Sequence, residues 1–288
     1  MKGLIVSNGY FDNNSTISQR QEIIDEFTKR GVAIDVIKSN TVPALIEDTD
    51  VKLLIQKYDF CIFLDKDVIL ANMLEKAGIT LFNSAEAIRV CDDKMLTYVT
   101  LAGNGIKMPK TISSPLMYTE NQDKKFLEKV SCELGFPIVV KNVYGSMGKS
   151  VWLAENSQQL EELFLRLRRF PHLYQKFVGK GYGEDIRVIT VGKKVVSAMK
   201  RINENDFRSN IELGGRGEAV TLTEKQIQLA EKVSQVLNLD YAGIDIIDED
   251  YVGEVNSNAF FREFEKVTGE KVAEKYVEYI INKIGDIK

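Results

Sequence analysis

The sequence predicts a parallel α/β layer followed by an α+β region, in a chain of 288 residues. Two observations lead to this fold class. Over residues 1–85, apolar strand-like runs alternate with helical runs, which is typical of a parallel sheet. Beyond residue 85, several apolar runs come in pairs joined by short turns, which is typical of antiparallel hairpins.

The first 85 residues should contain four strands and two helices. The expected strands are GLIV, VAIDVIKSN, YDFCIFLD and ITLFNS. One helix, TISQRQEIIDEFTKRG, has apolar residues at helical spacing and Gly31 as its C-cap. The other helix, KDVILANMLEKAG, ends at Gly78. These elements make up the first of three expected domains, residues 1–85.

A helix over residues 84–105, capped at Ser84, leads into the second expected domain, residues 86–178. The run FPIVVKNVYGSMGKSVWLAEN follows as a strand, a glycine loop and a second strand. A helix then starts at an N-cap at Ser157, and LYQKFV is a further strand.

The third expected domain, residues 179–288, begins with the glycine-rich GKGYG and the hairpin DIRVITVGKKVVSAMKR. An irregular polar stretch, INENDFRSNIELGGRGEA, leads to the helix TEKQIQLAEKVSQVLN. A second hairpin, made of AGIDII and YVGEVN, and a C-terminal helix complete the domain.

The composition excludes several classes of protein. Apolar residues make up 44% of the chain and charged residues 28%, as in ordinary globular proteins. The net charge of −4 argues against nucleic acid or an anionic membrane as the main partner. No apolar stretch approaches a membrane span, and the opening MKGLIVSNGY is expected to be a strand and not a signal peptide. We therefore expect a cytoplasmic protein, with a homo-oligomer left open.

The cysteines and the single histidine indicate neither a zinc site nor a covalent mechanism. Cys61, Cys91 and Cys132 are far apart and form no CxxC pair, so we expect buried free thiols. A Ser–His–Asp or Cys–His mechanism would have to use His172, which lies beside a proline in an expected loop. We expect His172 to have no catalytic role.

The second hairpin of the third expected domain carries a candidate metal site. If its loop is the four residues 248–251, Asp245 faces Glu254 and Gly243 faces Asn256. Side chains directly opposed in this way have Cβ atoms about 5 Å apart, and two carboxylates that close repel each other unless a cation lies between them. Two carboxylates and an amide oxygen suit Mg²⁺ held together with substrate phosphates. The alternative is an ordinary surface hairpin.

Two further groups of residues suit the binding of phosphates. Lys141 ends a strand before a loop with Gly145 and Gly148, whose backbone N–H groups could cradle phosphates. The loop is not a P-loop, because Val143 stands where a glycine is needed and a strand follows instead of a helix. A tight turn is the alternative for this loop.

The second group is rich in hydrogen-bond donors and lies within MKRINENDFRSN. It contains Lys200, Arg201, Arg208 and Asn210. Arginine binds phosphate strongly and with two hydrogen bonds, although a solvated loop would have a similar composition. Taken with the metal candidate, these groups predict a nucleoside triphosphate site.

The order of these motifs resembles the ATP-grasp superfamily, and within it the RimK-like carboxylate–amine ligases that add glutamate. The resemblance covers roughly residues 85–288. Its motifs are DFRSN with a following GG, AGIDII with GEVNS, and VVKNVYGSMGKSV. The resemblance implies an ATP-grasp fold with an N-terminal parallel α/β domain, called a pre-ATP-grasp domain in this family.

The resemblance also implies roles for individual residues. It implies that ATP is bound by Lys94, Lys141, Gly145, Ser146, Met147, Gly148, Gln175, Lys176, Phe177, Val178, Asp185, Lys200, Arg208, Ser209 and Asn210. Arg201 and Arg208 would be catalytic and face the transferring phosphate. Asp245, Glu254 and Asn256 would hold two Mg²⁺ ions, with Mn²⁺ as a substitute.

The family's chemistry, if it applies, requires no side-chain nucleophile. A substrate carboxylate would attack the γ-phosphate of ATP, and an amine would attack the resulting acyl phosphate to give an amide, ADP and phosphate. The carboxylate would come from an amino acid, a peptide or a protein. The amine would come from an amino acid such as glutamate.

Two departures from the family pattern leave the substrates open. The residues after Asn256 run Ser257 to Phe261 in place of a small residue and SPG, and Lys176 stands where an acidic residue is common. For Phe260 and Phe261 we favour a place in the core over a place in a pocket.

Two other functions remain as alternatives. One is a ligase of the D-alanine–D-alanine type, which usually has an arginine at the place of Gly243. The other is a nucleotide-binding module without ligase turnover.

Overall fold

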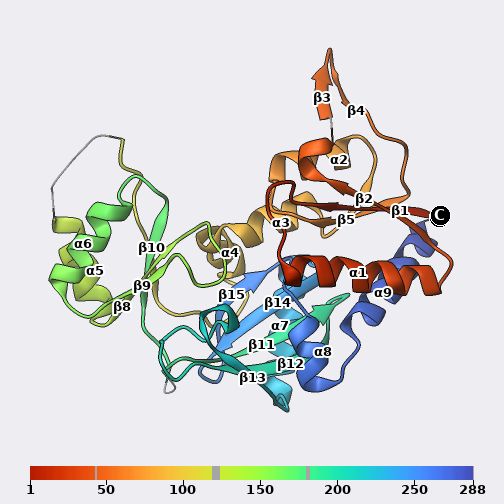
Figure 1. Ribbon diagram of the computed structural model, residues 1–288. Helices are drawn as coiled ribbons and strands as arrows, with labels where there is room; N and C mark the ends of the chain where they lie inside the picture. The colour runs from red at the N-terminus through yellow and green to blue at the C-terminus, as the bar shows by residue number, and fades with distance from the viewer. Residues whose placement is uncertain (43, 119–123, 180–181, 288) are drawn as a thin grey trace.

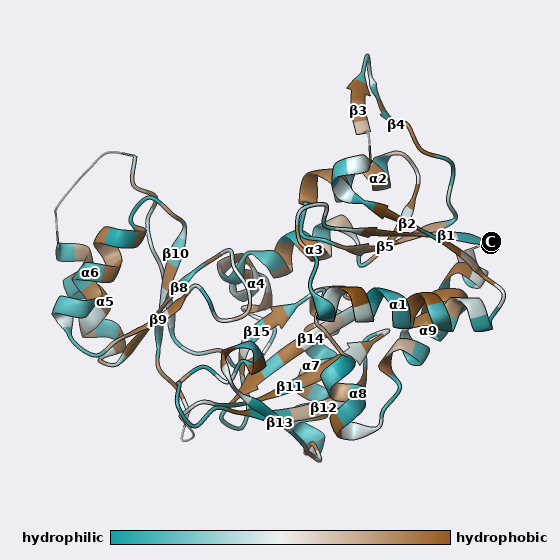
Figure 2. Cartoon of the chain, in the orientation of Figure 1, coloured by the Kyte–Doolittle hydropathy of each residue, from teal (hydrophilic) through white to brown (hydrophobic). Residues whose placement is uncertain are grey.

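The computed structural model describes residues 1–42, 44–118, 124–179 and 182–287. Three main sheets form the framework, one in each third of the chain (Figure 1). Figure 2 shows hydrophobic colour along most strands and mixed colour on the helices. This is expected where each helix packs its apolar face against a sheet and exposes its other face. Within the described residues, no helix is both long and apolar enough to cross a membrane.

The first sheet is parallel, as the sequence predicts, and its strand order is β2-β1-β5-β6. Its strands are β1 (Lys2–Ser7), β2 (Ala33–Lys38), β5 (Phe60–Leu64) and β6 (Thr80–Phe82). Its helices are α1 (Asn14–Lys29) and α2 (Val68–Lys76), with the short 3₁₀ turn η1 (Ser39–Thr41). A protruding hairpin, β3 (Ala44–Glu47) with β4 (Asp50–Leu53), was not expected from the sequence.

The expected single helix over residues 84–105 is two helices, so that prediction was wrong. They are α3 (Ala85–Asp92) and α4 (Lys94–Leu101). Ser84 caps the first helix as predicted. Asp93 adopts an extended backbone between them, and its side chain accepts hydrogen bonds from the backbone N–H groups of Met95 and Leu96. The break places Lys94 at the first turn of α4, where its N–H donates to the carbonyl of Val143.

The second sheet is antiparallel, in the order β7-β10-β8-β9, with α5 and α6 packed on it. Its strands are β7 (Thr111–Ser113), β8 (Ile138–Asn142), β9 (Val151–Ala154) and β10 (His172–Lys176), and its helices are α5 (Lys125–Leu134) and α6 (Ser157–Leu167). The glycine loop joins β8 to β9 as predicted. The N-cap of α6 is Asn156 and not Ser157, because the Asn156 side chain accepts from the N–H of Gln159.

His172 lies at the start of β10 and not in a loop, which corrects the prediction of its place. The side chain is buried. One ring nitrogen lies 2.7 Å from the carbonyl of Phe170 and the other 2.8 Å from the hydroxyl of Tyr174. Both nitrogens therefore have structural partners. Of the three thiols, Cys61 and Cys91 are buried as expected, whereas Cys132 is exposed.

The third sheet is antiparallel, in the order β13-β12-β11-β14-β15. Its strands are β11 (Glu184–Val191), β12 (Lys194–Ile202), β13 (Arg216–Ala219), β14 (Tyr241–Ile247) and β15 (Tyr251–Asn256). The helices of this region are α7 (Glu224–Val236), α8 (Arg262–Thr268) and α9 (Val272–Ile287), with the 3₁₀ turn η2 (Ile211–Leu213). Strand β13 lies within the stretch that we expected to be irregular.

One hydrophobic core joins the first sheet to the C-terminal region. Phe27 and Phe60 share it with Phe261, Phe264 and Tyr276, and all five side chains are buried. Each such side chain contributes about 1.5–3 kcal/mol when it is fully buried. The shared core ties the N-terminal layer to the third sheet, and the domain boundaries at residues 85 and 178 stay a prediction.

Candidate active site

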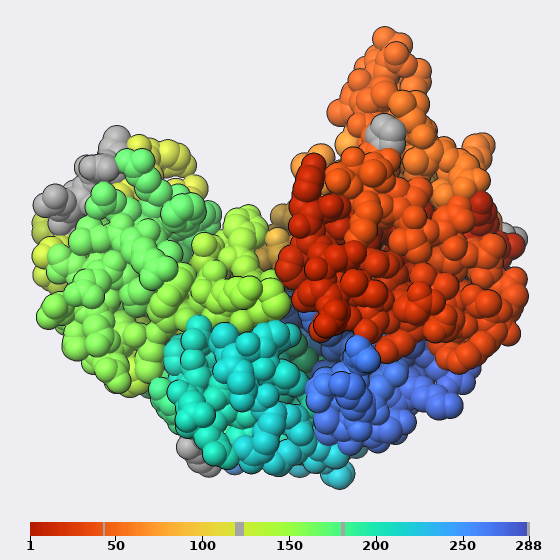
Figure 3. Space-filling view, in the orientation of Figure 1, coloured from red at the N-terminus to blue at the C-terminus, as the bar shows by residue number. Residues whose placement is uncertain are grey.

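Two cavities meet at the end of β15. The first, which we call the inter-sheet cavity, has a volume of about 110 Å³ and lies between the second and third sheets. The second, the N-terminal cavity, has a volume of about 310 Å³ and lies between the first sheet and the third. Glu254 and Asn210 line both. Figure 3 shows the hollow between the N-terminal lobe, in red, and the green lobe of the second sheet.

Most of the predicted site residues line these cavities. The inter-sheet cavity is lined by Lys141, Gly148, Gln175, Lys176, Phe177, Val178, Asp185, Arg201, Arg208, Ser209, Asn210, Asp245 and Glu254. The N-terminal cavity is lined by Ser146, Met147, Asn210, Glu254 and Asn256. Lys94, Gly145 and Lys200 line neither cavity, and the amine of Lys200 pairs with Glu184 at 2.9 Å.

The β14–β15 hairpin places Asp245 opposite Glu254, and Gly243 opposite Asn256, as predicted. The route to this register differs from the prediction. The loop has three residues and not four, since Ile247 pairs with Tyr251, and a bulge after Asp245 restores the expected register. Gly253 suits the bulge, because a Cβ atom there would lie 2.3 Å from the side chain of Ile247.

Positively charged side chains of the protein offset the repulsion between the two facing carboxylates. Arg187 makes a two-pronged ion pair with Asp245, at 2.6 and 2.7 Å, and Arg201 donates to the same carboxylate at 2.9 Å. Arg201 also pairs with Asp185. Burial acts to raise the pKa of Asp245, but the two guanidinium groups outweigh burial and hold that pKa below its ordinary value.

Lys94 is the cation beside Glu254. Its amine lies 3.2 Å from the Glu254 carboxylate and donates to the carbonyl of Gly145 at 2.7 Å. Burial acts to raise the pKa of Glu254, whereas nearby positive charge, chiefly that of Lys94, holds it below its ordinary value. Both carboxylates are therefore ionised at neutral pH, and each is already paired with cations of the protein.

Arg187, which pairs with the predicted metal ligand Asp245, was not singled out from the sequence. It lies on β11, directly opposite Asp245 on β14. These strands are neighbours in the sheet but far apart in sequence, so no turn fixed their register in advance. Its side chain also passes near Gly243, where a Cβ atom would lie 3.6 Å from the Arg187 Cδ. A guanidinium group thus reaches the aspartate from the neighbouring strand.

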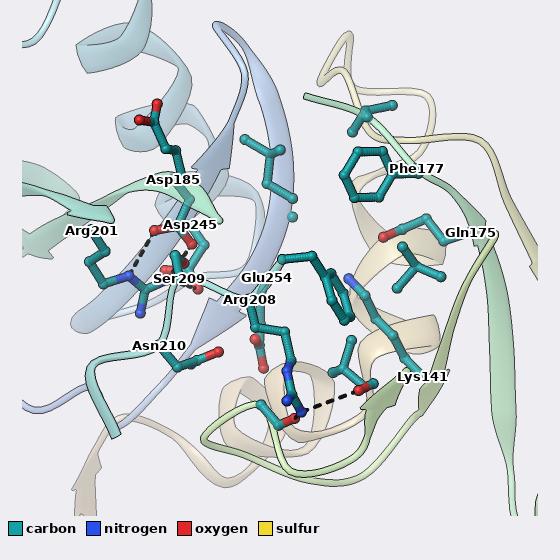
Figure 4. A pocket seen from close by; sticks show the side chains of 18 of the residues that line it. Lys141, Gln175, Phe177, Asp185, Arg201, Arg208, Ser209, Asn210, Asp245 and Glu254 are labelled. Carbon is teal, nitrogen blue, oxygen red and sulfur yellow. Dashed lines mark hydrogen bonds and ion pairs between the residues drawn. The ribbon is translucent and has the colours of Figure 1, made fainter. Parts of the chain in front are cut away.

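Lys141 faces the carboxylates across the inter-sheet cavity (Figure 4). Its side chain is buried, and it makes no hydrogen bond or ion pair with any residue that the structure describes. Burial lowers the pKa of Lys141, although Glu254, Asp245 and Asp185 act in the opposite direction. A buried cation without a direct partner is costly, which indicates that an anion binds here.

The glycine loop between β8 and β9 has an unusual backbone that brings it close to Asn210. Gly145, Met147 and Gly148 all have positive φ, at 142°, 59° and 68°. A Cβ atom at Gly148 would lie 2.6 Å from the amide oxygen of Asn210, so only glycine fits this approach. Arg208 donates to the carbonyl of Gly148 at 2.7 Å and thereby links the loop to the third sheet.

The strand β10 and the residues after it form the other wall of the inter-sheet cavity. The amide of Gln175 is oriented by a hydrogen bond of 2.8 Å to Thr111. The rings of Phe177 and Tyr182 lie 6.5 Å apart, and Tyr182 in turn lies 6.4 Å from Phe207. Gln175, Phe177 and Phe207 thus give this wall of the cavity both polar and aromatic side chains.

The residues present fit a metal ion. The Asn256 amide nitrogen is buried without a hydrogen-bond partner among the described residues, and its side chain belongs to the same strand and face as Glu254. An unpartnered amide N–H group lacks an acceptor, and a phosphate oxygen held beside the metal would supply one. The described residues contain no cluster of three acidic, histidine or cysteine side chains that could hold a metal alone, so phosphate oxygens would have to complete the set.

Phe260 and Phe261 lie in different surroundings, one at a cavity and the other in the core. Phe261 is fully buried in the core, whereas Phe260 lines the N-terminal cavity. The prediction of a core position is confirmed for Phe261 and wrong for Phe260.

Phe261→Ala should lower the free energy of unfolding by about 3–5 kcal/mol, because it leaves a cavity in a close-packed core. Phe260→Ala should change the free energy of unfolding by less than about 1 kcal/mol. Urea unfolding of both variants measures the difference. Equal losses would contradict the division between core and cavity.

The chain is similar to known proteins of one family. The model of the RimK-like ATP-grasp domain matches residues 91–280. Human N-acetylaspartylglutamate synthase A is 35% identical over 224 residues, and human beta-citrylglutamate synthase B is 37% identical over 222 residues. The matches cover 76% and 75% of this chain, and 56% of each relative. The chain thus spans little more than half the length of these curated relatives.

A solved structure supports the fold. The ATP-grasp ligase PsnB, in a complex with a precursor variant, Mg and ADP, superimposes with a TM-score of 0.70 at 17% sequence identity. The likeness covers 98% of both chains, so it includes the N-terminal layer. The fold is therefore the ATP-grasp fold predicted from the sequence, and the chain belongs to the RimK-like ATP-grasp family.

Proposed function

We propose that the chain is an ATP- and Mg²⁺-dependent carboxylate–amine ligase that forms an amide or peptide bond with release of ADP and phosphate. The observation that carries this proposal is the arrangement around the inter-sheet cavity. Lys141, buried and without a hydrogen bond or ion pair to any described residue, faces two ionised carboxylates, and Gly148 and Arg208 line the same cavity. This set of charges suits a triphosphate and its cations.

Each part of the cavity has a proposed task. The residues from Gln175 to Val178 hold the adenine, and Asp185 lies on the ribose side. Lys94, Lys141 and the glycine loop bind the phosphates, together with Arg208, Ser209 and Asn210. Asp245, Glu254 and Asn256 hold two Mg²⁺ ions, for which Mn²⁺ can substitute, and these ions neutralise the phosphate charge when bound.

The reaction needs positioning and charge neutralisation more than a reactive side chain. The substrate carboxylate attacks the γ-phosphorus, and ADP leaves. Arg201 and Arg208 stabilise the charge on the transferred phosphoryl group. The ammonium first gives up one proton to solvent, and the neutral amine then attacks the carbonyl carbon of the acyl phosphate. Phosphate leaves with the electron pair of the broken C–O bond, the nitrogen releases a second proton to solvent, and the amide remains.

We propose glutamate as the amine. The two curated relatives are named as synthases of products that both end in glutamate and differ in the other half. This difference points to a shared amine and a variable carboxylate. The carboxylate is then an amino acid, a peptide or another small acid. We keep a cytoplasmic location as a prediction, since Cys61 and Cys91 are free thiols.

The test is ATP turnover with Mg²⁺ in the presence of pooled amino acids, short peptides and small organic acids, with mass spectrometry of the products. We expect ADP and phosphate only with certain pools, together with a product lighter by one water than its two parts. Tight ATP binding without turnover in any pool would favour the alternative of a nucleotide-binding module. A dipeptide of D-alanine as the product would favour the alternative of the D-alanine–D-alanine type.

Metal binding should depend on the nucleotide. In the structure, Asp245 is paired with Arg187 and Arg201, and Glu254 with Lys94, so a metal ion must compete with cations already in place. We expect Mn²⁺, followed by electron paramagnetic resonance, to bind at least about tenfold more weakly without AMPPNP than with it. Equally tight binding without AMPPNP would contradict this competition.

A further inference from the structure

Asp65 is a buried carboxylate on the N-terminal wall of the N-terminal cavity. It directly follows β5, at the carboxyl end of the parallel sheet, and its side chain lines the cavity. In open α/β sheets, ligands bind outside the carboxyl ends of the strands. Asp65 is therefore placed where a ligand is expected, on the wall opposite the predicted metal ligands.

The carboxylate of Asp65 is held by neutral donors. The amide of Asn8 lies 3.1 and 3.2 Å from its two oxygens, and the backbone N–H of Lys66 donates to one of them at 2.7 Å. Asp65 makes no ion pair with any residue in the part of the chain that the structure describes. Its position is therefore fixed while its charge is not neutralised.

The other carboxylates of this cavity are either paired or exposed. The ion pairs join Asp12 to Arg20 and Lys38, and Glu254 to Lys94. Glu212 is exposed to solvent. A carboxylate that is only 9% exposed and has no cation is unfavourable unless a ligand supplies one.

We propose that Asp65 binds the ammonium group of the amine substrate. This inference rests on the proposed ligase function. The carboxylate to be activated must lie beside the phosphates, and hence near Arg208 and Glu254 in the inter-sheet cavity. The amine has to approach from the other side, through the N-terminal cavity, whose outer wall carries Asp65.

The chemistry of the site favours an ammonium over a metal ion. Divalent metals require several oxygen ligands, whereas Asp65 is a single carboxylate whose neighbour Asn8 turns a nitrogen toward it. An ammonium group needs few acceptors and gains a charge-assisted hydrogen bond. The cavity of about 310 Å³ suits a free amino acid.

The test uses the full chain loaded with AMPPNP and Mg²⁺, with each of the common L-amino acids as a probe and binding followed by NMR titration. We expect at least one amino acid to bind, and Asp65→Asn to weaken that binding by about 10- to 100-fold, the range for a hydrogen bond to a charged group. Glu212→Gln removes an exposed carboxylate from the same cavity and should leave the affinity unchanged.

A second measurement does not depend on the folding of the variant. The N-acetylated form of the same amino acid lacks the ammonium and should bind the unsubstituted chain about 10- to 100-fold more weakly than the amino acid itself does. Equal binding of the two forms, equal binding to both chains, or no amino acid bound by the unsubstituted chain would overturn the proposal.

Turnover of ATP, measured separately, distinguishes this inference from the ligase proposal. Asp65-dependent binding without any turnover would refute the ligase and leave the ammonium site. Turnover of ATP together with binding of the amine that does not depend on Asp65 would support the ligase and refute the ammonium site.

Discussion

Glu254→Gln should lower ATP turnover at least about a hundredfold while the chain keeps its fold. The substitution removes one charge and keeps the shape of the side chain. Glu254 lines both cavities and faces Asp245 across the hairpin, so it lies at the centre of the proposed metal site. Release of ADP in the presence of Mg²⁺ measures the rate, and circular dichroism shows whether the fold is kept.

Asp248→Asn is the matched control for this variant. It makes the same chemical change in the loop of the same hairpin, but at an exposed position. Its φ of 59° is a conformation that asparagine tolerates. We expect its turnover to equal that of the unsubstituted chain. Near-normal turnover in Glu254→Gln would refute the metal assignment.

Lys141→Met should weaken ATP binding at least about tenfold without loss of stability. The lysine is buried without a direct partner among the described residues, and its pKa lies below the ordinary value, so its folded-state charge is unfavourable at pH 7. That cost is present below the folded-state pKa and disappears as the pH rises toward the unfolded-state pKa. An apolar side chain of similar length removes the cost and also removes the contact with phosphate.

Two measurements test this pair of effects. Calorimetry with ATP gives the affinity, and thermal unfolding without ATP gives the stability, which should stay the same or rise. Lys129→Met, at an exposed lysine on α5 away from both cavities, serves as the control and should leave the affinity for ATP unchanged. Unchanged ATP affinity in Lys141→Met would remove this residue from the site.

The parts of the fold that follow from local pattern were predictable. Alternating strands and helices gave the parallel layer, and paired strands gave the hairpins. The exceptions depend on side-chain and strand-pairing contacts that the pattern does not show. Asp93 uses its side chain to end one helix and start the next, and the short strand β13 forms only because β12 lies beside it.

The candidate site was predictable where its residues are close in sequence. The facing pair Asp245 and Glu254 came from hairpin geometry, although a bulge at Gly253 and a shorter loop had to compensate for each other. Arg187 and Asp65 were missed because their roles depend on contacts between distant segments. Arg187 meets Asp245 across neighbouring strands, and Asp65 meets the site only through packing of the first sheet on the third.

The most direct test of the central claim, that a carboxylate is activated by phosphorylation, is the transfer of oxygen from that carboxylate to phosphate. The carboxylates of the active substrate pool are first enriched with ¹⁸O by acid exchange. The reaction is then run with ATP and Mg²⁺ in ordinary water, and mass spectrometry measures the ¹⁸O content of the released phosphate. Our account predicts one ¹⁸O atom in each phosphate formed with the amide. Phosphate without ¹⁸O would contradict it, because the γ-phosphate would then have been transferred to water.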